Sequence, residues 1–295
     1  MGRKHELEYM RYRTLIIIAL LFLAPPFHGR AADGVEVSVV LTSASGPYLE
    51  AFSAFREEYG APVRTYDLSS SRELPRSGIV VTFGGRAGAP GAYPRSVRLI
   101  RCLAPGAKAY ASSGDVVISM VPEPESALRG ISQIQPGIKK LVVFATHSSF
   151  GEYFDALAAA GKRSGMQVIA AKVGAADDIP GELRRLLSGM DAFWLLPDPQ
   201  LISASVFVTL RDFSRANRIP FYAPTAGLSE KGATAAVYSG FSEMGRAAAR
   251  AAKGGAVSGI VYPEKTSYAL NIAESAYIGL KIPPAAVRAA EELFQ

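Results

Sequence analysis

The sequence predicts an α/β protein built on parallel β-sheets. Strand-like and helix-like segments alternate nearly from end to end, an order typical of parallel sheets joined by right-handed crossovers. The strand-like segments are short apolar runs, as expected of strands that are buried on both faces. About 264 residues follow the leader described next, which is enough for two lobes of ordinary size.

Residues 1–31 have the features of a secretory signal peptide. Arg11 and Arg13 precede the apolar run Leu15–Leu23, which is too short to span a bilayer comfortably. Two prolines then break any helix, and Gly29–Ala31 supplies a small-x-small cleavage site. A short membrane anchor is the alternative interpretation. Because no cysteine lies near the cleavage site, we expect a periplasmic protein without a lipid anchor.

Charge and composition exclude several classes of function. The formal net charge is +6, and the leader contributes half of it through five basic and two acidic residues. The remaining excess is small and forms no basic stripe, so a nucleic-acid-binding surface is not expected.

The only cysteine is Cys102, so no intrachain disulfide can form, and we expect a buried thiol on the strand around Val97–Leu103. His147 is the one histidine beyond the leader, which excludes zinc sites of the usual His and Cys type. The mature chain has no G-x-S-x-G nucleophile motif. We therefore expect no enzyme, no metal and no cofactor.

The first half of the mature chain begins with one clear βα unit. Val35–Thr42 is a β-branched run, and after a turn the segment Tyr48–Tyr59 has apolar residues at helical spacing and ends at Gly60. Two further strands are expected at Ala61–Asp67 and Gly78–Phe83.

These two strands lack the usual helices. Leu68–Ser77 is too short for a normal crossover helix, and the sequence after Phe83 is rich in glycine and proline, which favours a loop.

From Glu123 onward the alternation is regular. The expected strands are Lys140–Ala145, Gln167–Val173, Ala192–Leu196, Pro220–Ala223 and Thr234–Tyr238, with short extended pieces near Val261 and Leu270. The expected helices are Ser126–Gln135, Gly151–Ser164, one capped by Asp178 and ended by Gly189, Ser203–Ala216, Phe241–Lys253, and two more after Ile272 and Pro284.

Two strand ends are the first candidates for a ligand site. Trp194–Pro199 is an apolar strand that ends on an acidic residue between two prolines, and Ile219–Thr225 ends in Ala-Pro-Thr. Open α/β sheets bind ligands at the carboxyl ends of their strands, so we expect these two ends to form one wall of the site.

Several short motifs follow one another in a characteristic order: Asp191-Ala192, Pro197-Asp198, Ile219-Pro220, Gly232-Ala233, Gly245-Arg246, Leu270-Asn271 and Gly279 through Pro283. This order resembles a family of bacterial ABC-transporter substrate-binding proteins, whose characterised members bind amino acids, aromatic ones among them. The resemblance is strongest over residues 139–284, and Tyr48 with its helix supports it earlier in the chain.

The resemblance implies a type I periplasmic-binding fold, in which two Rossmann-like lobes are joined by three crossovers and close on a ligand. The N-terminal lobe would comprise residues 32–121 and about 240–266. The C-terminal lobe would comprise residues 122–239 and about 267–295.

The resemblance also implies the site. Hydroxyls and backbone N–H groups at helix N-termini suit a carboxylate, and an acidic side chain suits an ammonium group. The implied ligand-binding residues are Ser43, Ser45, Tyr48, Phe83, Gly84, Gly85, Thr146, Ser148, Ser149, Asp198 and Thr225.

Most of these residues have a second interpretation that remains open. Asp198, the candidate for the amine, would otherwise be a helix cap or turn residue. Ser43 and Ser45 would form a polar turn, and residues 146–149 would cap the following helix. Phe83, Phe150 and Tyr48 would pack in the core instead of stacking on an aromatic ligand, and Trp194 is expected to be core.

The chain departs from the family pattern in its first lobe. Gly85 stands where members commonly have a hydroxyl residue, the following helix is replaced by the loop after Phe83, and Ser96–Leu103 lacks the usual aromatic and proline pattern. Either the ligand differs from the usual amino acids or affinity has been lost.

The function expected from the resemblance is that of a monomeric periplasmic solute-binding protein, which delivers a small molecule, such as an amino acid, to an ABC permease in the inner membrane. The alternative is a periplasmic sensing or interaction module with no transport role.

Overall fold

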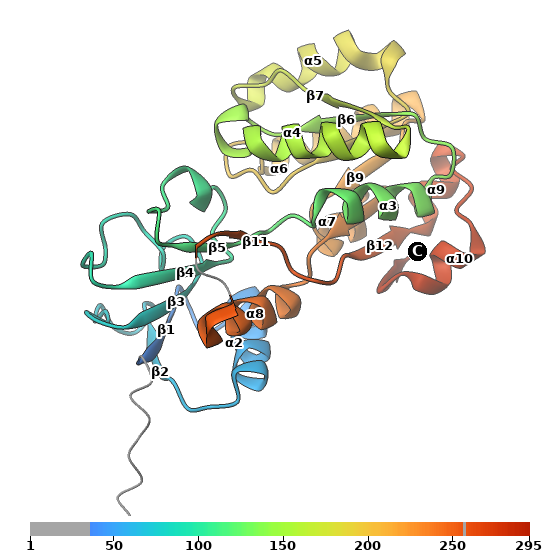
Figure 1. Cartoon of the computed structure of the whole chain (residues 1–295). Helices are drawn as coiled ribbons and strands as arrows, with labels where there is room; N and C mark the ends of the chain where they lie inside the picture. The colour runs from blue at the N-terminus through green and yellow to red at the C-terminus, as the bar shows by residue number, and fades with distance from the viewer. Residues whose placement is uncertain (1–35, 256–257) are drawn as a thin grey trace, which may run out of the picture. The chain divides into compact units, whose positions relative to one another are not determined.

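The computed structural model describes residues 36–255 and 258–295 (Figure 1). The predicted signal peptide lies outside these residues. Within the described part of the chain, no helix combines the length and the apolar character that crossing a membrane requires. The predicted α/β class with parallel sheets is confirmed.

The first sheet has six strands, all paired in parallel, in the order β11-β5-β4-β3-β1-β2. Its strands are β1 (Val37–Leu41), β2 (Arg64–Asp67), β3 (Ile79–Phe83), β4 (Arg98–Cys102), β5 (Val116–Ile118) and β11 (Gly259–Val261). The buried runs that predicted parallel strands therefore pair side by side, although β11 comes from far along the chain.

The second sheet has seven strands in the order β13-β12-β10-β9-β8-β6-β7. Only the β10–β12 pair is antiparallel. Its strands are β6 (Lys140–Phe144), β7 (Gln167–Ala170), β8 (Ala192–Leu195), β9 (Phe221–Ala223), β10 (Ala235–Tyr238), β12 (Ser267–Asn271) and β13 (Glu292–Phe294).

Helices cover both faces of the second sheet but only one face of the first. The helices are α2 (Gly46–Tyr59), α3 (Pro124–Ile134), α4 (His147–Ser164), α5 (Ile179–Leu186), α6 (Ala204–Asn217), α7 (Ala226–Glu230), α8 (Phe241–Arg250), α9 (Ile272–Ile278) and α10 (Pro284–Ala289). One face of the second sheet packs on α3, α4 and α10, and the other packs on α5 and α6.

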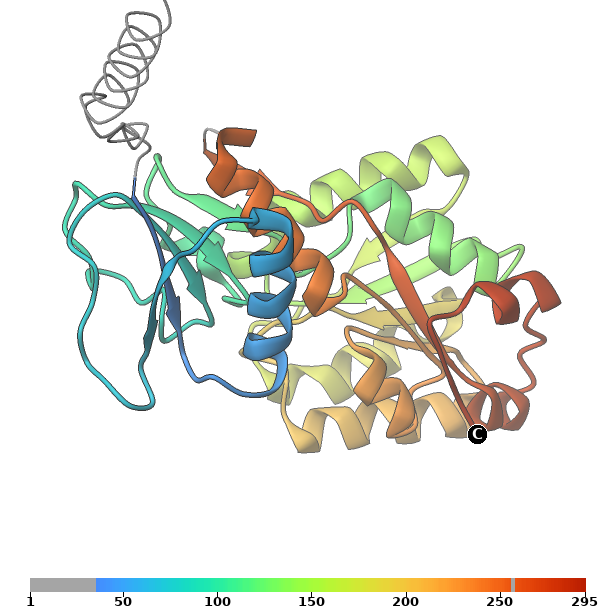
Figure 2. The same ribbon diagram turned by 90° about the horizontal axis from the view of Figure 1, so that it is seen from below.

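Two helices cover one face of the first sheet. Helices α2 and α8 lie side by side, as Figure 2 shows for the blue and orange helices, and bury Phe52, Phe55 and Met244 against the strands. Gly245 of α8 is the point of closest approach, because a Cβ atom there would lie 1.9 Å from the backbone oxygen of Ala51. The absence of a side chain at Gly245 thus sets the spacing of the two helices.

Replacing Gly245 by alanine is expected to lower the free energy of unfolding by about 1–3 kcal/mol, because the two helices must separate to admit the methyl group. Chemical denaturation followed by circular dichroism measures the change. Gly181 of α5 is the matched control, since a Cβ there meets no atom within 4 Å. Alanine at Gly181 is expected to stabilise by up to about 1 kcal/mol. A variant at Gly245 as stable as the control would contradict the close packing.

Loops cover the other face of the first sheet, as the glycine- and proline-rich sequence after Phe83 predicts. Val80 and Leu99 pack there beneath Ala87 and Tyr93 of the loop between β3 and β4. Tyr93 donates a 2.7 Å hydrogen bond from its hydroxyl to the carbonyl oxygen of Ala87, which ties the loop to itself.

A buried ion pair anchors this loop to the sheet. The guanidinium of Arg101 on β4 lies 3.0 Å from the carboxylate of Asp115 and also donates to the carbonyl oxygen of Gly88. The two charged side chains are only 4% and 6% exposed. Asp115 further accepts the backbone N–H of Ser112 at 2.9 Å, and Arg101 lies over the ring of Tyr110. The ion pair and hydrogen bonds of Arg101 thus hold the loop on this face of the sheet, where an amphipathic helix would otherwise pack.

The chain passes between the two lobes three times. Residues 119–123 lead from β5 to α3, residues 239–240 lead from β10 to α8, and residues 262–266 lead from β11 to β12. The carboxyl ends of the parallel strands of both sheets therefore adjoin these crossovers (Figure 1).

Four elements differ clearly from the expectation. The short strands β5 and β13 and the five-residue helix α7 were not predicted, because three to five residues give no measurable periodicity. Helix α4 begins at His147 and not at Gly151. The hydroxyl residues expected to precede the helix thus form its first turn, with Thr146 as the N-cap.

Candidate functional site

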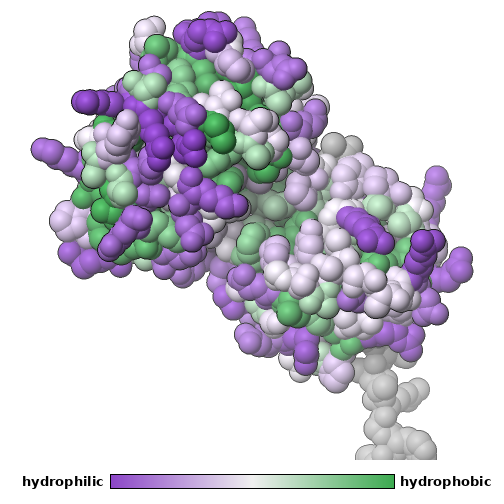
Figure 3. Space-filling model, turned by 180° about the vertical axis from the view of Figure 1, so that it is seen from behind, coloured by the Kyte–Doolittle hydropathy of each residue, from purple (hydrophilic) through white to green (hydrophobic). Residues whose placement is uncertain are grey.

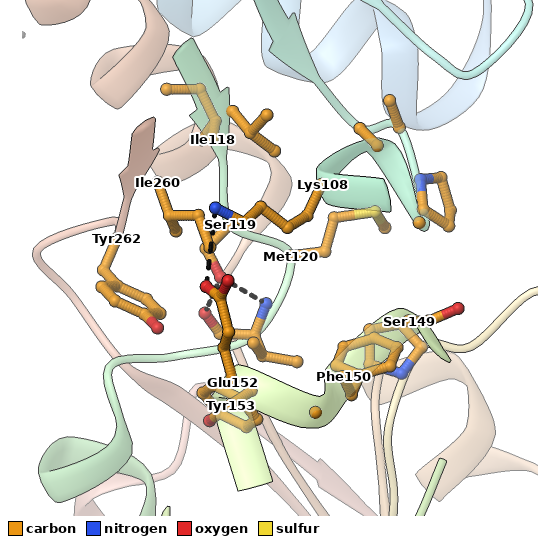
Figure 4. Close-up of a pocket in the computed structure, with 18 of the residues that line it drawn as sticks. Lys108, Ile118, Ser119, Met120, Ser149, Phe150, Glu152, Tyr153, Ile260 and Tyr262 are labelled. Carbon is orange, nitrogen blue, oxygen red and sulfur yellow. Dashed lines mark hydrogen bonds and ion pairs between the residues drawn. The ribbon is translucent and has the colours of Figure 1, made fainter. Parts of the chain in front are cut away.

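A cleft of about 670 Å³ lies among the loops at the carboxyl ends of the strands (Figure 4). The first lobe supplies residues 104–108 after β4 and residues 117–121 of β5 and the first crossover. The second lobe supplies the start of α4 and Pro197, and the third crossover supplies Tyr262. In the space-filling view, apolar and neutral residues gather in the recess between the lobes (Figure 3).

The N-terminus of α4 forms the polar end of the cleft. Ser148 and Ser149 line it, and the hydroxyl of each lies 3.3 Å from the hydroxyl oxygen of Thr146. The first N–H groups of a helix have no acceptor within the helix, and the helix dipole makes this end positive. The arrangement suits an anionic group such as a carboxylate.

Asp198 holds this helix end in place. Its carboxylate accepts the backbone N–H and the hydroxyl of Thr146, each at 2.6 Å, and the backbone N–H of Gln200 at 2.9 Å. The side chain is wholly buried. The acidic residue at the end of β8 therefore joins the ends of β6 and β8, which fixes the first turn of α4.

Aromatic and aliphatic side chains from both lobes line the rest of the cleft. The rings of Phe150 and Tyr262 each lie 6.4 Å from the ring of Tyr153, and Ile118 and Ile260 line the cleft beside them. The hydroxyl of Tyr153 donates to the carbonyl oxygen of Pro122 at 2.8 Å.

Burial raises the pKa of Tyr153 well above its usual value. The pKa of Tyr262 is also raised, first by burial and then by nearby Glu123 and Glu152. Burial disfavours the charged phenolate, so both rings present neutral surfaces at physiological pH.

Charged side chains stand at the mouth of the cleft. Lys108 comes from the first lobe, and Glu152 and Asp155 come from α4. The Nζ atom of Lys108 lies 3.5 Å from the Oε2 atom of Glu152, and this ion pair connects the two lobes. Among the lining residues described, Lys108 is the only lysine or arginine.

A second cavity of about 580 Å³ adjoins the cleft, since Met120 and Pro197 line both. Thr225, the N-cap of α7, and Ser239 on the second crossover line this cavity. The hydroxyl of Ser239 is buried and has no hydrogen-bond partner among the described residues.

The predicted site residues of the second lobe lie on or just behind the two cavities. Ser148 and Ser149 line the cleft, and Thr225 lines the second cavity. Thr146 and Asp198 are buried behind the cleft and bonded to each other. Their contact with a ligand stays a prediction, and in this structure they position the residues that reach the cavity.

The predicted residues of the first lobe gather elsewhere, at the ends of β1 and β3. Ser43 and Ser45 lie there with their hydroxyls 3.1 Å apart, and none of these residues is among those lining the two cavities. A Cβ on Gly84 would lie 2.7 Å from the ring of Tyr48, so these two residues pack closely, with Gly85 open beside them.

Phe83 occupies the core. It is fully buried, and its ring makes edge contacts with Phe52 and Phe55 of α2.

Sequence reasoning missed Lys108, Glu152, Met120 and Tyr262. Lys108 follows a predicted strand end, so the rule that ligands meet strand ends could have found it. Met120 and Tyr262 lie on segments that connect the two lobes. The sequence alone does not show where these segments run, because it does not show that β11 pairs with β5. No pattern in the sequence marks Glu152, which looks like an ordinary exposed helix residue.

No metal site is apparent in the described residues, where no three His, Cys, Asp or Glu side chains gather closely enough to hold an ion. The cleft combines hydroxyls, helix N–H groups and one lysine with the carboxylates of Glu152 and Asp155, a set that suits a polar organic ligand.

Comparison with protein families identifies the chain. A family model described as ABC transporter substrate binding protein matches residues 123–277, slightly more than half of the sequence. The chain belongs to this ABC transporter substrate-binding family. No curated protein sequence matches the chain.

Solved structures with the same fold agree with the family. The ABC domain in complex with L-Trp from Streptococcus pneumoniae has a TM-score of 0.60 and 14% identity, covering 89% of this chain and 100% of that one. A conserved domain protein from Vibrio cholerae has a TM-score of 0.59 and 13% identity, covering 88% and 100%. A ligand-free, open substrate-binding protein with adhesive properties from Clostridium difficile has a TM-score of 0.57 and 14% identity, covering 88% and 99%. The family member described here thus has the type I periplasmic-binding fold.

Proposed function

We propose that this chain is the solute-binding component of an ABC importer and that it binds an amino acid in the cleft between its lobes. The observation that carries the proposal is the cleft itself, where the polar N-terminus of α4 and apolar side chains from both lobes line a volume of about 670 Å³. Small-molecule sites are typically concave and mostly apolar, with a few convergent polar groups.

The chemistry of the two ends fits the two halves of an amino acid. The first turn of α4, with Ser148 and Ser149, suits the α-carboxylate. The wall of Phe150, Tyr153 and Tyr262 suits an apolar or aromatic side chain. The solved relative from Streptococcus pneumoniae, which holds L-Trp, supports the same class of ligand.

Binding would act by shifting the lobes toward a closed form. A ligand that contacts both lobes stabilises the state in which both sets of contacts are made at once. The three crossovers supply the hinge. No catalytic step is proposed, and the chain would hand its ligand to a permease in the inner membrane.

Calorimetric titration with a panel of amino acids, including the aromatic ones, is expected to show saturable binding with a Kd of about 1 μM or tighter, equivalent to about −8 kcal/mol. Replacing Phe150 by alanine is expected to weaken binding of an aromatic ligand by about 3-fold to 10-fold, since an aromatic contact contributes about 0.5–1.5 kcal/mol beyond burial.

Tyr277 provides the control for this series, because it is 65% exposed on α9 and absent from both cavities. Its replacement by alanine is expected to leave affinity unchanged. If no amino acid binds and small-angle scattering shows no compaction with any member of the panel, the amino-acid importer proposal is refuted.

Export supports this role and needs its own test. We propose a periplasmic monomer that is released by cleavage after Ala31, without a lipid anchor. The N-terminal sequence of protein recovered from the periplasm is expected to begin at Ala32. A full-length N-terminus in the membrane fraction would favour the short anchor instead.

A sensing or interaction module is the second candidate function. The loop between β3 and β4, which stands where the family pattern has a helix, and the absence of Ser43 and Gly85 from the linings of the two cavities favour it. Neighbouring genes for a permease and an ATPase would support transport, whereas a neighbouring histidine kinase or cyclase would support sensing.

A further inference from the structure

The ion pair between Lys108 and Glu152 brings one positive and one negative charge to the same point of the cleft from opposite lobes. Lys108 lies on the short turn Ala107–Ala109 that follows β4, and Glu152 lies in the second turn of α4. Figure 4 shows the two side chains extending toward each other above Tyr153 and Phe150.

The ion pair between Lys108 and Glu152 contributes little to the stability of the fold. The side chains of Lys108 and Glu152 are 46% and 76% exposed, and exposed ion pairs contribute little to folding because water screens the charges and holding two long side chains costs entropy. The position is more informative, because both residues line the cleft and the pair joins the two lobes.

We propose that Lys108 and Glu152 are the counter-ions of a zwitterionic ligand, with Lys108 binding its carboxylate together with the first turn of α4 and Glu152 binding its ammonium group. The proposal rests on the proposed function and adds the residues that select the ligand's charge. In the free protein the two side chains neutralise each other. On binding, the ligand enters between them and replaces one ion pair by two.

Long flexible side chains make this exchange possible without a change of fold. Each new contact would be a charge-assisted hydrogen bond of about 2.7–2.9 Å, the stronger kind. Closing of the lobes would expel water, and the same charges attract more strongly at lower dielectric. The ligand would therefore join the lobes more firmly than the direct pair does.

A ligand with a single charge would be disfavoured at this point. An amine would pair with Glu152 and an acid with Lys108, but each would separate the protein's own pair and leave the other side chain without a partner. Leaving a charge unpaired as water is expelled costs free energy, so the pair would reject both analogues. Asp155, exposed one turn further along α4, is the competing acidic residue.

Three probes of matched shape test the assignment: L-phenylalanine, phenethylamine, which lacks the carboxylate, and 3-phenylpropionate, which lacks the amine. The full chain is expected to bind L-phenylalanine at least tenfold more tightly than either analogue. Lys108→Met is expected to weaken L-phenylalanine about tenfold without weakening phenethylamine. Glu152→Gln is expected to weaken L-phenylalanine about tenfold without weakening 3-phenylpropionate.

Matched controls separate this pattern from a general disturbance. Lys162→Met changes an exposed lysine on α4 outside both cavities, and Glu125→Gln changes an exposed pair with Arg163. Both are expected to leave all three affinities unchanged. Asp155→Asn tests the competing acidic residue, and a tenfold loss of L-phenylalanine affinity there with none at Glu152 would assign the ammonium group to Asp155 and overturn the proposal.

The affinities of the unaltered chain and of the variants distinguish a failure of this inference from a failure of the proposed function. If L-phenylalanine binds the unaltered chain and both Lys108→Met and Glu152→Gln bind it within twofold, the importer proposal stands and the counter-ion assignment is wrong. The same set built on L-leucine, isoamylamine and 4-methylpentanoate extends the test to aliphatic ligands. If no amino acid of the panel binds the unaltered chain, both proposals fail.

Discussion

Replacing Asp115 by alanine is expected to lower the free energy of unfolding of the first lobe by about 3–5 kcal/mol, the usual cost of removing one partner from a buried ion pair. The guanidinium of Arg101 would stay buried with its charge unpaired, and the backbone N–H of Ser112 would lose its acceptor. The loop that covers the sheet would lose its anchor as well, since Arg101 also holds the carbonyl of Gly88.

Urea denaturation followed by circular dichroism measures this change, and calorimetry shows whether the lobes unfold separately. Arg163→Ala is the control, because its ion pair with Glu125 is exposed and should contribute no more than about 1 kcal/mol. The double variant Arg101→Met with Asp115→Leu should recover part of the loss, since no isolated charge remains buried. A loss below about 1 kcal/mol for Asp115→Ala would show that the pair does not anchor the loop.

Replacing Asp198 by alanine is expected to lower the free energy of unfolding by at least about 3 kcal/mol. Three donors lose their acceptor, namely two groups of Thr146 and the N–H of Gln200, and each buried unsatisfied donor costs about 1–3 kcal/mol. We also expect weaker ligand binding, because the first turn of α4 would no longer be held in place.

Thermal unfolding and ligand titration on the same variant separate the two roles that the sequence left open for Asp198. The exposed Asp212, whose carboxylate pairs with neighbouring Arg211, is the control and should show little change on replacement by alanine. Lost stability together with weaker binding would agree with a positioning role. Unchanged stability with binding abolished would instead assign Asp198 to direct contact with the ligand amine.

The sequence predicts the fold well where buried strands and capped helices repeat. Strands β6 and β8 and helix α6, with Ser203 as its N-cap, appear close to their expected bounds, because apolar runs and caps are local signals. The loop after Phe83 is likewise found where glycine and proline favour it. The anchor of that loop could not be predicted, since nothing local pairs Arg101 with a residue fourteen positions away.

The candidate site was predictable only in part. Strand ends and helix starts correctly direct attention to Ser148 and Ser149, which line the cleft. The sequence around Asp198 was equally compatible with binding a ligand and with capping a turn. Which role applies depends on how closely the ends of β6 and β8 approach each other. Tyr262 joins the cleft through the third crossover, which no local pattern reveals.

The threefold passage of the chain between the lobes also governs when each lobe can be completed. The first sheet needs β11, and its covering helix α2 needs α8, yet both are synthesised after most of the second lobe. Such long-range pairing raises contact order and slows folding. The first lobe of a newly made chain therefore stays incomplete until β11 has been synthesised, after most of the second lobe.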